Sequence, residues 1–149
     1  MVTLGVQPAA TWPTLWLLHG ANEPEDYKSW TTYTTAEVPA DVVFGFAQAP
    51  NGDVYFGQLT GFPFVPGTAR VYRVPATGGI PTVVAEGFTN IIDIAFDKRG
   101  RLYVLEIATN GLANTPPGEL SVGRLVRVNK DGSRTTLASE GLNAPGGFV

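Results

Sequence analysis

Short apolar runs, separated by Gly, Pro, Asn and Asp residues, follow one another from about residue 38 onward. Each run is about 4–8 residues long, a length typical of β-strands. Polar and apolar residues alternate at 70–74 and 124–128, as in strands with one covered face. The runs at 54–56 and 102–105 are almost entirely apolar, as in strands covered on both faces. The pattern predicts an all-β fold.

The strand pattern occurs twice, because two stretches of the chain align with each other. Residues 51–58 align with 99–106 at an offset of 48 (51 to 99). Residues 69–74 align with 123–128 at an offset of 54 (69 to 123), which places an insertion between these two strands of the second unit. The strands are expected at 42–49, 53–58, 69–75 and 81–86, and again at 91–97, 101–107, 124–129 and 134–139.

A repeat of about 40–50 residues with four antiparallel strands is typical of a β-propeller blade, whose sheet buries its faces against neighbouring blades. The sequence therefore predicts a partial β-propeller with two four-stranded antiparallel blades, at about 38–88 and 89–142. Residues 143–149 are expected to start a third blade. Residues 1–37 show no such period and are expected to form a separate, irregular N-terminal segment.

Three phrases in the repeats carry a family resemblance: Gln58-Leu-Thr-Gly-Phe-Pro-Phe64, residues 86–96 and residues 102–107. With them, the stretch 38–149 resembles the ScyD/ScyE family. The resemblance implies a six-bladed propeller related to NHL repeats and to calcium-dependent, lactonase-like propellers. It also implies an exported bacterial protein, extracellular or periplasmic. A ring of about six blades needs about 300 residues, so we expect this chain to be part of a longer protein.

Composition excludes several classes of protein. The chain has 10 Lys and Arg against 13 Asp and Glu, and these bases form no cluster, so no nucleic-acid partner is expected. It has no Cys, which excludes disulfides and thiolate metal sites. No apolar stretch reaches the ~18 residues of a membrane span. No signal peptide is recognisable, because the first residues lack a basic region and are interrupted by Pro8 and Pro13.

Polar residues at the ends of the innermost strands are the candidates for a site at the mouth of a propeller channel. The candidates are Asp41, Gln58, Asn90, Asp93, Glu106 and Asn143. Oxygen ligands of this kind suit Ca²⁺. The lactonase-like resemblance implies Glu106 as a carboxylate ligand and Asn90 as an amide ligand, with calcium as the possible cofactor. The alternative is that these side chains cap turns by bonding backbone N–H groups.

Glu106 ends an apolar run, so its carboxylate is expected to be partly buried and to need a partner. The partner could be a metal ion, a proton or the neighbouring loop at Thr109 and Asn110. The longest loop of the first unit, residues 59–67, carries Phe62 and Phe64, which either bind a ligand or pack over the blade.

Two functions remain open from the sequence. The first is a non-catalytic binding or scaffold module of the ScyD/ScyE type, because the chain has a clear repeat, one His and no nucleophile motif. The second is a calcium-dependent lactonase or esterase that acts at the channel mouth. Either could self-associate through exposed blade faces, and the pattern names no small-molecule ligand.

Overall fold

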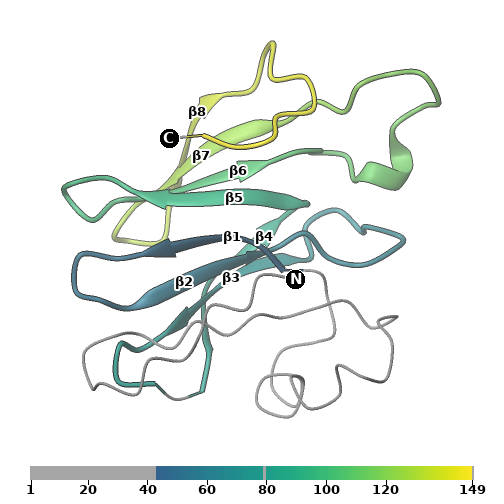
Figure 1. The fold of residues 1–149 in the computed structure, drawn as a ribbon. Helices are drawn as coiled ribbons and strands as arrows, with labels where there is room; N and C mark the ends of the chain where they lie inside the picture. Colours follow the sequence, from purple (N-terminus) through teal and green to yellow (C-terminus); the bar gives the residue numbers. More distant parts are fainter. Residues whose placement is uncertain (1–42, 79, 149) are drawn as a thin grey trace, which may run out of the picture.

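Two four-stranded antiparallel sheets make up the part of the chain that the computed structural model describes, residues 43–78 and 80–148 (Figure 1). Each sheet is a meander in which consecutive strands are neighbours, and β1 packs beside β5. The first sheet contains β1 Val43–Gln48, β2 Val54–Gln58, β3 Ala69–Val74 and β4 Thr82–Phe88. The second contains β5 Ile91–Phe96, β6 Leu102–Glu106, β7 Arg124–Val128 and β8 Arg134–Ala138.

The structure confirms the predicted all-β fold, with its two four-stranded units. Seven strands lie within the predicted ranges, but β4 continues two residues beyond the expected end, to Phe88. The extension arises because Ala69 pairs with Phe88 after an irregularity in the β3–β4 register. The described residues contain no α-helix, and the insertion in the second unit carries a short 3₁₀ helix, η2 Leu112–Asn114.

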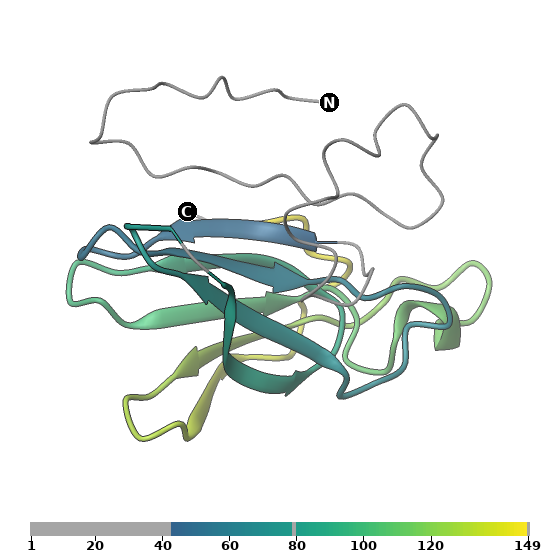
Figure 2. The same cartoon turned by 90° about the horizontal axis from the view of Figure 1, so that it is seen from below.

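All the long connections lie at one end of the sheets and all the tight hairpin turns at the other, as two perpendicular views show (Figures 1 and 2). We call these the loop end and the turn end. At the turn end, Asp97 accepts hydrogen bonds from the backbone N–H groups of Arg101 and Arg99 and from the Arg101 side chain. These bonds, led by that from the Arg101 backbone, hold the pKa of Asp97 well below its ordinary value.

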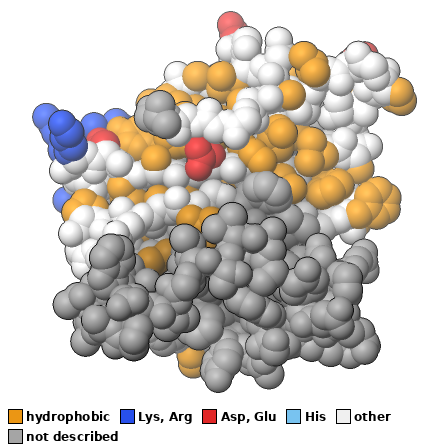
Figure 3. Space-filling model, viewed as in Figure 1, with side chains coloured by type: hydrophobic (Ala, Val, Ile, Leu, Met, Phe, Trp, Pro, Cys, Tyr) orange, Lys and Arg blue, Asp and Glu red, His pale blue; other side chains and the backbone are white. Residues whose placement is uncertain are grey.

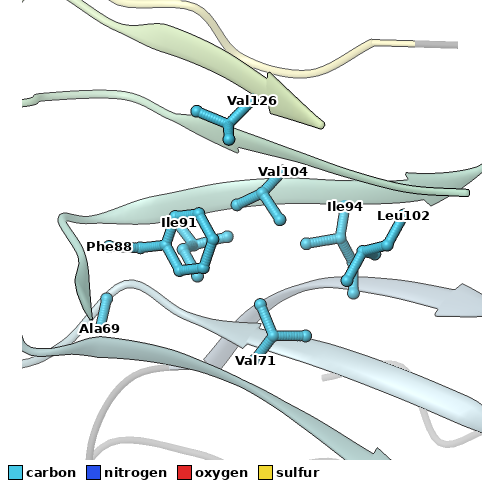
Figure 4. Packing of buried hydrophobic residues seen from close by; sticks show 8 residues of the cluster. All are labelled: Ala69, Val71, Phe88, Ile91, Ile94, Leu102, Val104 and Val126. Carbon is cyan, nitrogen blue, oxygen red and sulfur yellow. The ribbon is translucent and has the colours of Figure 1, made fainter. Parts of the chain in front are cut away.

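The main core lies between the two sheets and is built from branched apolar residues and Phe88 (Figure 4). Figure 4 shows Val104 and Val126 of the second sheet on one side and Ala69 and Val71 of the first on the other. Phe88 and Ile91, which flank the link between the sheets, are fully buried. The link itself is therefore part of the core. The core cluster consists of Ala69, Val71, Phe88, Ile91, Ile94, Leu102, Val104 and Val126.

A second cluster lies on the opposite face of the first sheet, where Phe56 stacks on Tyr72 with ring centroids 5.2 Å apart. The repeat alignment matches Phe56 with Val104 and Tyr72 with Val126. The equivalent face of each sheet is therefore apolar, as expected of propeller blades that stack in series.

Residues 143–148 form no strand, although they follow part of the path of the preceding repeat. Ala144 adopts φ +44, close to the φ +48 of its equivalent, Asn90. The backbone N–H of Phe148 donates to Oδ2 of Asp93 at 3.0 Å, which places this segment beside β5. The predicted N-terminal segment, 1–37, lies outside the described residues.

Candidate functional site

The loop end gathers the connections that follow β2, β4 and β6. The β2–β3 loop, residues 59–68, and the β6–β7 loop, residues 107–123, project from the same end of the sheets (Figures 1 and 2). Between them, Thr89 and Asn90 link the two sheets. Three of the predicted site residues, Gln58, Asn90 and Glu106, lie at this end and are buried.

Asn90 joins the two loops through its side chain, which is only 1% exposed. Its Nδ2 donates to the backbone carbonyl of Leu59 at 2.5 Å and to Oγ1 of Thr60 at 3.3 Å. Its Oδ1 accepts from the backbone N–H of Leu112 at 2.9 Å. Asn90 has φ +48, a left-handed conformation that Asn tolerates better than most residues. Both polar atoms of the amide are therefore bonded to the protein.

Glu106 is completely buried at the end of β6. Its Oε1 accepts from the backbone N–H of Thr89 at 2.6 Å, and its Oε2 accepts from Nε of Arg124 at 2.6 Å. Arg124 begins β7 and lies directly opposite Glu106 in the ladder. The structure confirms that this carboxylate is buried and has partners. The loop partners considered from the sequence, Thr109 and Asn110, are wrong, because cross-strand register brings Arg124 closer.

Gln58 occupies the equivalent place in the first sheet and is also buried. Its Oε1 accepts from the backbone N–H of Arg70, the residue equivalent to Arg124, at 3.1 Å. The same bond pattern thus recurs with an amide in one blade and a carboxylate in the next. In both blades, a buried side chain at the end of the second strand bonds to the start of the third strand.

The other predicted polar residues lie apart from this group. Asp93 is half-buried in β5, where its Oδ1 accepts from the N–H of Ile94 and its Oδ2 from that of Phe148. Asn143 is exposed and forms an isolated bridge with Val122. Asp41 lies outside the described residues. Within 43–78 and 80–148, no three His, Cys, Asp or Glu side chains come together as a group that could hold a metal ion.

The β2–β3 loop rests against the β6–β7 loop. The carbonyl oxygen of Phe64 comes so close to Gly111 that a Cβ there would lie 2.5 Å from it. Phe64 is half-buried, and its ring meets that of Phe62 edge-on at 6.3 Å. The N–H of Gly67 donates to Oγ1 of Thr89 at 2.9 Å, which ties the loop to the link between the sheets. The loop is therefore held at both its middle and its end.

Several large apolar side chains of the loop end remain exposed, and Figure 3 shows hydrophobic groups on the side from which the loops project. Phe62 is 84% exposed and Leu120 is 66% exposed. Val65 and Val122 are each about half exposed. Of the two aromatic residues proposed as ligand contacts, Phe64 packs partly into the loop and Phe62 is available to a partner.

Sequence reasoning missed Thr89, Arg124 and Leu120 as parts of this end of the molecule. A signal for Arg124 was present, since the alignment places Arg70 and Arg124 at the same repeat position. No comparable signal marked Thr89, which acts through its backbone N–H.

No family model matches the chain, and comparison with curated proteins finds no similar sequence. In the described part of the chain, no helix has the length and apolar character needed to cross a membrane.

Replacing Asn90 by Ala should lower the free energy of unfolding by about 1–3 kcal/mol, because it leaves the Leu112 N–H and the Leu59 carbonyl without this partner. Ala is sterically compatible with the backbone here, since its equivalent Ala144 has a similar φ. Urea denaturation measures the loss. Hydrogen exchange should quicken in both loops, and unchanged exchange at Leu112 would contradict the assigned role.

Proposed function

We propose that this chain is a binding or scaffold module of the ScyD/ScyE propeller type, with no catalysis of its own. The observation that carries the proposal is the saturation of the best candidate ligands. Both oxygens of Glu106 and both polar atoms of Asn90 are bonded to protein groups, and those bonds fix the loops in place. A rigid scaffold that presents loops is a common design for binding.

The binding surface of this module is the exposed apolar part of the loop end. Phe62 and Leu120 lie on different loops, which the Asn90 hydrogen bonds hold together. Exposed large apolar groups that are clustered on one surface favour contact with an apolar face of a partner. The resemblance to an exported family places this contact outside the cytoplasm.

Self-association through a blade face is supported by a separate observation. Tyr103 and Leu125 project from the outer face of the second sheet, on the opposite side from the core residues Val104 and Val126. The repeat alignment matches them with Tyr55 and Val71, which face the second sheet from the first. The outer face therefore offers a further blade, from another copy of the chain, the kind of surface that the first sheet offers the second.

A calcium experiment tests the non-catalytic proposal. Millimolar CaCl₂ should leave both the melting temperature and the hydrogen exchange of Thr89 and Leu112 unchanged, because a metal at Glu106 or Asn90 has to replace existing bonds. Hydrolysis of p-nitrophenyl acetate and of a simple lactone should stay at the buffer rate. A calcium-dependent rise in melting temperature, together with hydrolysis that the Glu106→Gln variant loses, would overturn the proposal in favour of the hydrolase.

A further inference from the structure

A groove of about 440 Å³ lies between the two sheets at the turn end, opposite the loop end. Its apolar part comes from both sheets and includes Tyr55 of β2, Phe96 of β5 and Leu102 of β6. The Tyr55 and Phe96 rings meet edge-on across the sheets, with centroids 4.7 Å apart. Burial raises the pKa of Tyr55, in keeping with a partly desolvated floor. A volume of this size is within the range of small-molecule sites.

Basic side chains line the rim of this groove: Arg101, Arg127 and Lys130. Arg127 is oriented by two bonds, from Nε to Oδ1 of Asn129 at 3.1 Å and from a terminal nitrogen to Oγ1 of Thr135 at 3.4 Å. A guanidinium has five N–H donors, so these bonds leave others for a ligand. The Lys130 ammonium has no hydrogen-bond or ion-pair partner among the described residues.

Charge at this end opposes the charge of the whole chain, which is −3. Lys98 and Arg99 of the β5–β6 turn add to the rim bases, and blue side chains gather at this end in Figure 3. The nearby carboxylates are engaged, Asp97 by Arg101 and Asp131 by the backbone and hydroxyl of Ser133. A positive rim above an apolar floor is complementary to a ligand that is apolar at one end and anionic at the other.

We propose that the groove binds a small amphipathic carboxylate, with its ring or branched body on Tyr55 and Phe96 and its carboxylate between Arg127 and Lys130. The groove and the loop end share no residue, so this site is independent of the proposed binding by the loops. Arg101 stays with Asp97 and closes the rim on the side of the β5–β6 turn.

Naphthalene-2-carboxylate is a suitable probe, and naphthalene-2-carboxamide is its uncharged match. Amide NMR shifts on titration of the whole chain should move for residues 100–102 and 127–130. The carboxylate should bind about tenfold or more tightly than the carboxamide, because it adds charge-assisted hydrogen bonds. Raising the salt concentration should weaken only the carboxylate. Equal affinity of the two probes, or shifts confined to the loop end, would overturn the proposal.

Variants locate the anion within the groove. Lys130→Gln and Arg127→Gln should each weaken the carboxylate several-fold and leave the carboxamide unchanged. Lys98→Gln and Arg99→Gln remove the same charge from the same end but lie outside the groove lining, so they should change the affinity less than twofold. Lys130 is exposed in a turn, so its variant should fold normally. Equal losses from both pairs would show general charge attraction and would refute the site.

Discussion

Replacing Glu106 by Leu should lower the free energy of unfolding by about 3–5 kcal/mol, the cost typical of breaking a buried ion pair from one side. The variant leaves Arg124, which is about one-third exposed, facing an apolar group, and leaves the buried N–H of Thr89 without its acceptor. Urea denaturation followed by tryptophan fluorescence measures the loss, and the slope with denaturant should stay unchanged if the fold is retained.

Glu106→Gln should cost less, about 1–2 kcal/mol, because a neutral amide oxygen still accepts from Thr89. The first sheet supplies the precedent, since Gln58 fills the equivalent buried place with its Oε1 on the backbone of Arg70. The double variant Glu106→Leu with Arg124→Leu should recover part of the loss, since no charge is then left without its partner. If Glu106→Leu and Glu106→Gln cost the same, the ion pair with Arg124 contributes little.

The strands were predictable because each depends on local information. Turn residues such as Asn51-Gly52 and Asp131-Gly132 separate the runs, and the repeat shows each run twice. The extra residues at the end of β4 were not predictable. They depend on the β3–β4 register, which pairs Ala69 with Phe88 across an irregularity.

The candidate site was predictable in its residues but not in its bonds. The repeat placed Gln58 and Glu106 at strand ends, and the apolar run before Glu106 indicated burial. The partner Arg124 lies beyond the inserted loop, so finding it required the exact register of β6 against β7. Asn90 bonds to loops from both blades, a relation that depends on how the sheets stack and that no spacing along the chain reveals.

Gly45 marks the closest approach of the two sheets that the described residues show at a glycine of β1. A Cβ at this position would lie 2.7 Å from Cα and 2.9 Å from the carbonyl carbon of Asp93 in β5. These are backbone atoms of a central contact between sheets, so they cannot move aside as a flexible side chain would. Gly45 also has φ +70, which is strained for any residue with a Cβ.

Gly45→Ala should therefore lower the free energy of unfolding by about 2–5 kcal/mol, the sum of a conformational cost of about 1–2 and an overpacking cost of about 1–3 kcal/mol. Gly118→Ala separates the two causes, because Gly118 has φ +84 but open space around it and should show the conformational cost alone. Urea denaturation of both variants gives the difference. Equal losses would mean that β1 and β5 can separate without cost, and the close packing of the two blades would then contribute little to stability.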